Sequence, residues 1–289
     1  MTENTRGAAQ DRAEPVGVVG AGTMGVGVCQ SLIQAGLDVV LVEPDARAAD
    51  GARERLAQSL RLTRLLGRGP AEVGGRVQWA HSPEALDGVG FVVECAPENR
   101  DLKESLFAEL DRICPPRAVF ASCTSAIPIA LLAARTSRPE RVLGLHFMNP
   151  VPLKDTVEVV RAEATSQETM DRALALLGRL GKETVVVPDG PGFVLNRVLM
   201  LCIAQAAALV DEGAADGATV DAVFEKCLGH PMGPLRTADL IGLDNVMDTM
   251  AVLREQTGDD RYAAPPTFAA LVADGHLGRK TGKGFHDYS

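Results

Sequence analysis

The sequence predicts an α/β protein in which an N-terminal, mostly parallel sheet of the Rossmann type precedes an all-helical domain. Three observations predict this fold. Short apolar segments alternate with amphipathic ones from residue 16 to residue 188, as in a doubly wound sheet. A glycine-rich turn follows the first apolar segment, and beyond residue 189 the apolar spacing is that of helices alone.

The first strand and its turn form the most informative part of the chain. The apolar run V-G-V-V predicts a buried strand, and Gly20, Gly22 and Gly25 follow it with the spacing G-x-G-x-x-G. The first glycine permits a tight turn, the second lets a pyrophosphate approach the backbone, and the third lets the next helix pack closely on the strand. That helix begins with Thr23 and Met24, whose N–H groups would face the phosphates.

A second apolar strand, expected at residues 38–42, ends at Glu43. In this fold an acid about 20 residues beyond the glycines accepts hydrogen bonds from the adenosine ribose, and it repels a 2′-phosphate. The strand, turn, helix, second strand and acid together predict that the chain binds NAD rather than NADP. The alternative is a glycine-rich turn in an α/β protein that binds no nucleotide.

The rest of the sheet domain follows from the same alternation. An arginine-rich helix is expected at residues 46–66 and another helix at 99–112. Ser166 is expected to cap a helix that runs to residue 180. The turn N-P-V-P joins two late strands closely enough to make an antiparallel edge. The further strands are expected at residues 77–79, 91–95, 118–121, 142–146, 156–160 and 183–187.

The segment P-D-G-P-G marks a domain boundary, because two prolines and two glycines continue neither a helix nor a strand. Beyond it, helices are expected at residues 193–211, 219–228 and 238–255. The first is apolar nearly all round, which predicts burial on several sides and a homodimer interface. We therefore expect a disordered tail at residues 1–14, an NAD-binding domain at 15–188 and a helical substrate and dimerisation domain at 189–289.

Composition narrows the classes of partner. The net charge of −9 argues against binding to nucleic acid, which needs dense lysine and arginine. The six cysteines form no C-x-x-C pair and predict reduced thiols in a cytoplasmic protein. Cys227 and His230 alone are too few ligands for zinc, so no metal is expected. The N-terminus does not resemble a signal peptide and the longest apolar run is too short for a bilayer, so we expect no membrane association.

Four polar residues are expected at strand ends or at the domain boundary, where open α/β sheets bind ligands. Ser125 follows the fifth strand, His146 ends the sixth, Glu158 lies beyond the N-P-V-P turn, and Asn196 begins the long helix. A neutral histidine can remove a hydroxyl proton near pH 7, and a carboxylate on its other nitrogen fixes the tautomer. The set predicts oxidation of an alcohol by NAD in a cleft between the domains. The alternatives are a core histidine and a solvated glutamate.

Several motifs closely resemble the L-3-hydroxyacyl-CoA dehydrogenase family, and most closely its short bacterial 3-hydroxybutyryl-CoA dehydrogenases. They are L-H-F-M-N-P-V-P, D-G-P-G-F-V-L-N-R, H-P-M-G-P-L and G-R-K-T-G-K-G-F-H-D-Y. The resemblance implies NAD-dependent oxidation of a 3-hydroxyacyl thioester, with His146 as base, Glu158 as its partner, and Ser125 and Asn196 at the substrate. It places the NAD contacts on the glycine loop and on Glu43, Ala96, Glu98, Lys103, Ser125 and Asn149.

The chain departs from the family pattern near the expected thioester. Cys123 and Ala126 stand where the family usually has Asn and Ser, and the run after N-P-V-P is more polar. The lysine-rich run of the CoA-binding helix is replaced by one with arginines. The resemblance and these departures place the substrate contacts on Ser59, Arg64, Arg68, Ser125 and Lys154.

The departures leave three readings of the substrate and activity. Sequence drift would leave a 3-hydroxyacyl-CoA substrate. An altered site would instead take a polar acyl group, or one on an acyl carrier protein, such as a glyceryl group destined for a polyketide extender unit. A catalytically silent relative with a binding or structural role is the third, and the intact His146, Glu158 and Asn196 argue against it.

Overall fold

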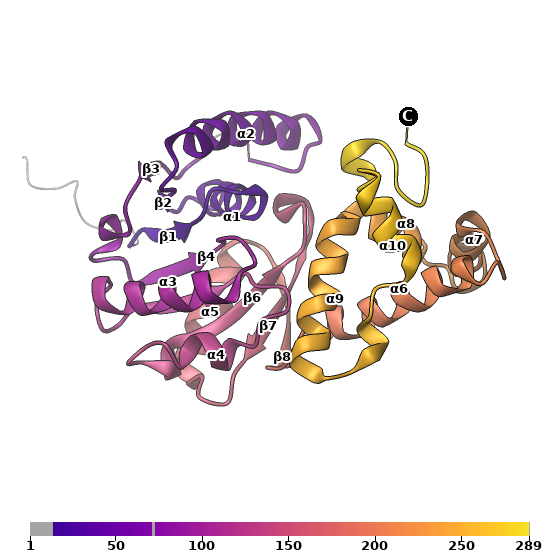
Figure 1. The fold of residues 1–289 in the computed structure, drawn as a ribbon. Helices are drawn as coiled ribbons and strands as arrows, with labels where there is room; N and C mark the ends of the chain where they lie inside the picture. Colours follow the sequence, from indigo (N-terminus) through magenta and orange to yellow (C-terminus); the bar gives the residue numbers. More distant parts are fainter. Residues whose placement is uncertain (1–13, 71–72, 289) are drawn as a thin grey trace, which may run out of the picture. The chain divides into compact units, whose positions relative to one another are not determined.

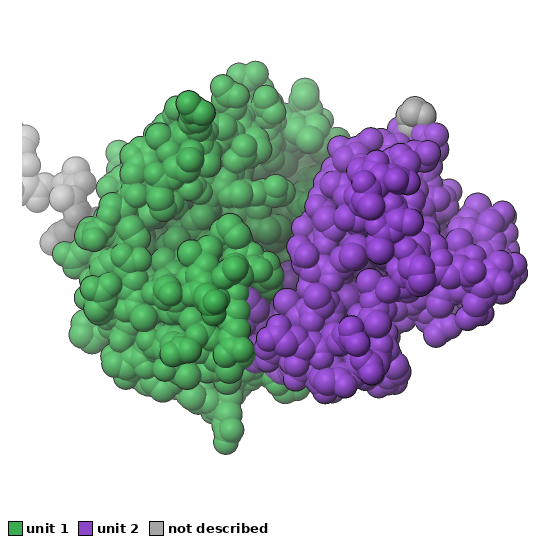
Figure 2. Space-filling view, in the orientation of Figure 1, with its two compact units in different colours: residues 1–124, 129–189 green, residues 125–128, 190–289 purple. Residues whose placement is uncertain are grey.

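The structure is a computed structural model that describes residues 14–70 and 73–288 (Figure 1). All but the last residue of the predicted disordered tail lies outside the described residues. The chain divides into two compact units, which Figure 2 shows in different colours. The first comprises residues 1–124 and 129–189, and the second comprises residues 125–128 and 190–289.

In the described part of the first unit, eight strands form one sheet in the order β3-β2-β1-β4-β5-β6-β7-β8. The strand order reverses between β1 and β4, and ligands of open α/β sheets bind at the carboxyl ends of strands beside such a reversal. Only β6 and β7 pair antiparallel among these strands, as the N-P-V-P turn predicts. The strands are β1 Val16–Val19, β2 Val39–Val42, β3 Val77–Ala80, β4 Phe91–Glu94, β5 Val119–Ser122, β6 Val142–Phe147, β7 Thr156–Arg161 and β8 Glu183–Pro188.

Helices cover both faces of this sheet (Figure 1). The core of one face joins the strands to α1 (Thr23–Gln34), α2 (Ala46–Leu65) and α5 (Gln167–Arg179). Ser166 caps α5 as predicted, since its hydroxyl accepts a hydrogen bond from the backbone N–H of Thr169.

The other face carries α3 (Arg100–Ile113) and α4 (Ile129–Ala133). Phe107 of α3 meets the ring of Phe120 edge-on at 6.2 Å, while Val119 and Ala121 of the same strand belong to the first core. Successive side chains of a strand point to opposite faces, which places α3 opposite α1 and α2.

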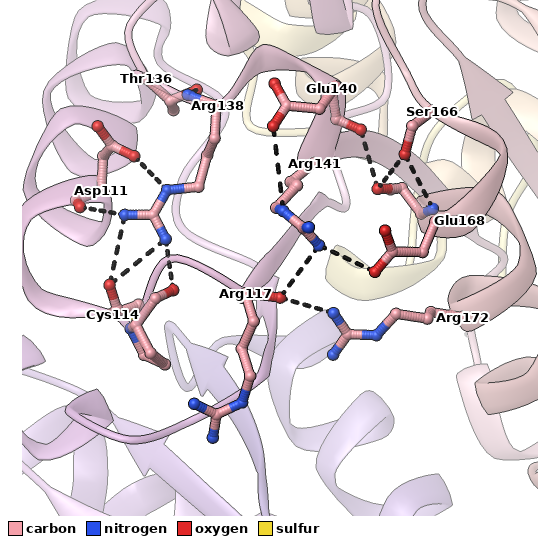
Figure 3. Close-up of polar contacts among 12 residues, drawn as sticks. Asp111, Cys114, Arg117, Thr136, Arg138, Glu140, Arg141, Ser166, Glu168 and Arg172 are labelled. Carbon is pink, nitrogen blue, oxygen red and sulfur yellow. Dashed lines mark hydrogen bonds and ion pairs between the residues drawn. The ribbon is translucent and has the colours of Figure 1, made fainter.

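Arginines fix the loops at the amino ends of β5 and β6, as Figure 3 shows. Nε of Arg138 donates to Oδ1 of Asp111 at 2.6 Å, and its two terminal nitrogens donate to the backbone carbonyls of Asp111, Cys114 and Pro115. Arg172 likewise donates to two loop carbonyls. Because these guanidinium groups bind carbonyl groups of the segments that precede the strands, we interpret this end of the sheet as structural.

The second unit is helical, with a core of its own. The prediction of one continuous helix at residues 238–255 is wrong. Gly242 has a φ of +100° and separates α8 from α9. A positive φ of this kind interrupts a right-handed helix and is readily adopted by glycine alone. The final helix was not predicted. The helices are α6 Leu195–Asp211, α7 Gly217–Leu228, α8 Pro234–Ile241, α9 Leu243–Thr257 and α10 Pro266–Ala273.

The expectation that the long helix is buried on several sides is only partly correct. One side of α6 packs into the helical core through Met200, Ile203 and Ala207, but Val198 is 65% exposed. The helix is therefore amphipathic in its burial although its sequence is apolar nearly all round. None of the helices in the described ranges has both the length and the apolar character that a membrane crossing requires.

Two buried carboxylates hold the C-terminal residues of the second unit. Asp239 accepts hydrogen bonds from the backbone N–H groups of Phe285 and His286, and Asp221 lies 2.7 Å from Nε2 of His286. Burial raises the pKa of Asp239 despite these donors. The end of the last motif quoted above, G-F-H-D-Y, therefore has a structural role in this unit.

Candidate active site

The glycine loop has the shape that a dinucleotide needs. Gly20 has a φ of +93°, and a Cβ there would lie 2.7 Å from the carbonyl oxygen of Cys95. A Cβ on Gly25 would overlap the carbonyl oxygen of Gly20. At Gly22, by contrast, a Cβ would meet no atom within 4 Å. A side chain at the first or third glycine would therefore collide with the protein's own backbone. The backbone at the second glycine, at the start of α1, is accessible, and a phosphate can approach it there.

Two charged side chains hold the peptide groups of Ala21 inside this loop. The backbone N–H of Ala21 donates to Oε2 of Glu43 at 2.9 Å, and the N–H of Asp45 donates to the other carboxylate oxygen at 3.2 Å. On the other side of the residue, Nη2 of Arg55 donates to the carbonyl oxygen of Ala21 at 2.9 Å. The sequence pattern identified Glu43, as a ligand of the adenosine ribose, but it did not identify Arg55.

The loop after β4 repeats the arrangement around Ala96. The N–H of Ala96 donates to Oε1 of Glu94 at 2.7 Å, and Nζ of Lys103 donates to the carbonyl oxygen of Ala96 at 3.0 Å. Lys103 and Glu94 also pair directly at 2.6 Å, and each side chain is only 1% exposed. Burial lowers the pKa of Lys103, but the charges of Glu94 and Glu98 outweigh that effect and raise it above the ordinary value.

Hydrogen bonds join this loop to the one that follows β5. The Ser122 hydroxyl donates to Oε2 of Glu94 at 2.5 Å, and the Thr124 hydroxyl donates to Oε1 of Glu98 at 2.6 Å. Glu94, Ser122 and Thr124 were not predicted from the sequence. An acid at the end of a fully apolar strand, which had identified Glu43, was the available signal for Glu94.

The predicted catalytic pair comes together in the antiparallel part of the sheet. His146 of β6 lies directly opposite Glu158 of β7 in the strand register. Nδ1 of His146 is 2.8 Å from Oε2 of Glu158, and both side chains are more than nine-tenths buried. The turn N-P-V-P thus folds Glu158 back beside His146, as predicted from its short length. A carboxylate in this position can orient an imidazole and stabilise its protonated form.

The other two predicted residues belong to the second unit. Nδ2 of Asn196, at the start of α6, donates to the carbonyl oxygen of Ser125 at 2.7 Å. The N–H of Gly192 donates to the carbonyl of Ala126 at 3.0 Å, so residues 125–128 are held by the start of the helical unit. His146 and Glu158 therefore meet within one unit, and Ser125 and Asn196 meet within the other.

The predicted substrate contacts on α2 and beyond are more scattered. Arg64 and Lys154 are exposed and Ser59 is half-buried. Arg68 lies 3.9 Å from Asp155, which brings the end of α2 to the segment that follows the N-P-V-P turn. The predicted NAD contact Asn149, in that turn, is exposed.

Comparisons with known proteins identify the family of the chain. The models of the NAD-binding domain and the C-terminal domain of 3-hydroxyacyl-CoA dehydrogenase match residues 15–190 and 192–288. A probable 3-hydroxybutyryl-CoA dehydrogenase of Bacillus subtilis is 42% identical over 275 residues, which cover 94% of this chain and 96% of that protein.

Solved structures are similar over almost the whole chain. The crystal structure of (S)-3-hydroxybutyryl-CoA dehydrogenase from Ralstonia eutropha is 38% identical with a TM-score of 0.84, covering 96% of this chain and 99% of that one. The crystal structure of Mycobacterium tuberculosis FadB2 is 36% identical with a TM-score of 0.90, covering 96% of this chain and 100% of that one.

Proposed function

The chain belongs to the 3-hydroxyacyl-CoA dehydrogenase family of NAD-dependent oxidoreductases, and on that premise we propose that it oxidises a 3-hydroxyacyl thioester such as 3-hydroxybutyryl-CoA to the 3-oxoacyl thioester. The buried pair of His146 and Glu158, 2.8 Å apart, is the observation that carries the proposal. When bound, NAD accepts the hydride that leaves the carbinol carbon.

In this proposal His146 is the base that takes the hydroxyl proton. Glu158 is hydrogen-bonded to Nδ1, so Nε2 is the nitrogen that receives the proton. The carboxylate also stabilises the imidazolium that forms. Ser125 and Asn196 hydrogen-bond the substrate oxygens, and the bond from Asn196 to the Ser125 carbonyl fixes the direction of the amide.

We assign the cofactor-binding residues by their position around the two loops. Glu43 binds the adenosine ribose, and the backbone of Gly22, Thr23 and Met24 binds the phosphates. Lys103 is buried against Glu94 and the Ala96 carbonyl. In the proposal it therefore positions the loop rather than touching NAD. The residues assigned to the nicotinamide half are Ala96, Glu98, Ser125 and Asn149.

A His146→Gln variant tests the proposal. Loss of the base should lower kcat by about 10²- to 10⁴-fold, because general-base catalysis contributes that much. NADH binding, followed by fluorescence, should stay unchanged. The matched control is His230→Gln, which removes an exposed histidine of the second unit. Turnover of the His146 variant within tenfold of the control would refute the assignment. If the unaltered protein does not oxidise NADH with a 3-oxoacyl thioester, that result would favour a catalytically silent relative.

The exposed end of α2 favours a second candidate, in which a carrier protein presents the thioester. Leu62, Leu65 and Leu66 are 53%, 85% and 55% exposed. Arg61 and Arg64 lie among them, in a chain whose net charge is −9. A nucleotide phosphate needs the arginines but not the leucines, whereas an acidic protein with an apolar face is complementary to both.

Two substrates with the same acyl group separate these candidates. We compare 3-hydroxybutyryl-CoA with 3-hydroxybutyryl carrier protein in the unaltered chain, Leu65→Ser and the control Leu228→Ser, which removes an exposed leucine of the second unit. Docking on α2 predicts about a tenfold loss of kcat/KM for the carrier substrate in Leu65→Ser alone, since a buried leucine contact is worth about 1.5–3 kcal/mol. No turnover of the carrier substrate by the unaltered chain would exclude this candidate.

We also propose that the exposed side of α6 joins two copies of the chain. Val198, Leu201 and Cys202 line a hollow of about 570 Å³ with Arg261 and Pro265, all within the second unit. An apolar helix side of this kind is typical of a homodimer interface. Light scattering at micromolar concentration should give a dimer, and Val198→Lys should give a monomer. A monomeric unaltered chain would refute the proposal.

A further inference from the structure

Arg55 of α2 lies against the glycine loop from the side opposite Glu43. Its Nη2 donates to the carbonyl oxygen of Ala21 at 2.9 Å, while Glu43 accepts from the N–H of the same residue at 2.9 Å. A Cβ on Gly51 would lie 3.1 Å from Nη1 of Arg55, so the guanidinium folds back along its own helix to reach the loop. One residue of the loop therefore contacts a carboxylate through its N–H and a guanidinium through its carbonyl.

The guanidinium of Arg55 retains most of its binding capacity. A guanidinium has five N–H donors, and one of the five is used by the Ala21 carbonyl. The side chain is exposed, and it forms no ion pair within the described residues. Lys103, in the equivalent place beside Ala96, is fully buried and bonded to Glu94. Arg138 in Figure 3 has its donors committed to a carboxylate and loop carbonyls.

We propose that Arg55 is placed to bind the 2′-phosphate of NADP, and that the Glu43 carboxylate keeps the unaltered chain selective for NAD by repelling that phosphate. A 2′-phosphate requires a nearby cation and is repelled by an acid at the ribose. The structure provides both groups on Ala21. Removal of the Glu43 charge therefore leaves the site with the cation that binds the 2′-phosphate of NADP. The inference concerns the cofactor alone and does not depend on the acyl substrate.

A double-mutant cycle in cofactor binding tests this proposal. NADH and NADPH are titrated by fluorescence into the unaltered chain, Glu43→Gln, Arg55→Met and the double variant. Gln can still accept the Ala21 N–H but loses the second acceptor that the Asp45 N–H uses, so NADH binding by Glu43→Gln reports whether the loop keeps its shape. We expect Glu43→Gln to bind NADPH about tenfold or more tightly than the unaltered chain does, because a charge-assisted hydrogen bond replaces a repulsion. In the double variant this gain should disappear.

The control removes the same positive charge from a different helix, α3. Arg112, in the last turn of α3, is exposed, and Arg112→Met with Glu43→Gln should retain the full gain in NADPH binding. An equal gain with and without Arg55 would overturn the proposal, as would no gain in Glu43→Gln when NADH still binds. The assay contains no thioester, so its failure would leave the dehydrogenase proposal intact.

Discussion

The loops after β1 and β4 share one design but differ in exposure. In each, a glutamate at a strand end accepts the N–H of an alanine, and a cation from a helix donates to the carbonyl of the same alanine. Around Ala21 these groups are Glu43 and the exposed Arg55, and around Ala96 they are Glu94 and the buried Lys103. The same polar arrangement can therefore face a ligand in one loop and form part of the core in the other.

Burial changes what the charges contribute. Glu94 and Lys103 are removed from water, so each depends on the other to offset its desolvation. Glu43 and Arg55 keep contact with solvent, where a charge interaction contributes only about 0–1 kcal/mol. The buried arrangement around Ala96 therefore fixes the loop geometry, and the exposed one around Ala21 leaves charge available for a bound dinucleotide.

Lys103→Met should have the largest effect, because it leaves the Glu94 carboxylate buried without its cation. Breaking a buried ion pair costs about 3–5 kcal/mol, and we expect a fall of that size in the free energy of unfolding measured with urea. The matched change in the exposed loop, Arg55→Met, should stay within about 0.5 kcal/mol of the unaltered chain, as surface substitutions usually do. Equal losses in the two variants would contradict the comparison.

The sequence predicts most of the architecture around these loops because its signals are local. The glycine spacing fixes the first turn and Glu43 the end of the second strand. The N-P-V-P turn is short enough to pair β6 with β7, and the resulting register places His146 opposite Glu158.

The features that the sequence did not predict depend on contacts between distant segments. The position of Glu94 at the end of an apolar strand was a signal in the sequence, but its pairing with Lys103 and Ser122 joins segments that the sequence does not place side by side. In the sequence Arg55 does not differ from the other arginines of α2, and only the structure shows its contact with the glycine loop. Gly242 breaks a helix that its neighbours favour, which propensity alone does not reveal.

Ser122→Ala tests how far the buried arrangement depends on its neutral member. The Ser122 hydroxyl donates to Oε2 of Glu94, and a hydrogen bond to a charged group contributes about 1.5–3 kcal/mol. We expect a loss in that range by urea unfolding, smaller than that of Lys103→Met, because the ion pair itself remains. The control is Thr237→Ala in the second unit, whose hydroxyl donates to a backbone carbonyl rather than to a charge. A loss for Ser122→Ala no larger than the control's would show that Glu94 does not need this donor.

The smallest expected effect is a difference between the two loops in how unfolding free energy depends on pH above pH 10. The pKa of Lys103 is raised in the folded state because Glu94 and Glu98 outweigh its burial, so above the ordinary lysine value of about 10.4 the folded chain retains a proton that the unfolded chain loses. The stability that Lys103 contributes is therefore complete below that pH and declines as the pH rises through the folded pKa. The difference in unfolding free energy between the unaltered chain and Lys103→Met should be constant from pH 7 to pH 10 and then narrow.

The same comparison with Arg55→Met should show no such narrowing, because arginine stays protonated throughout. A difference for Lys103→Met that stays constant above pH 11 would mean that the pair does not hold the proton on Lys103.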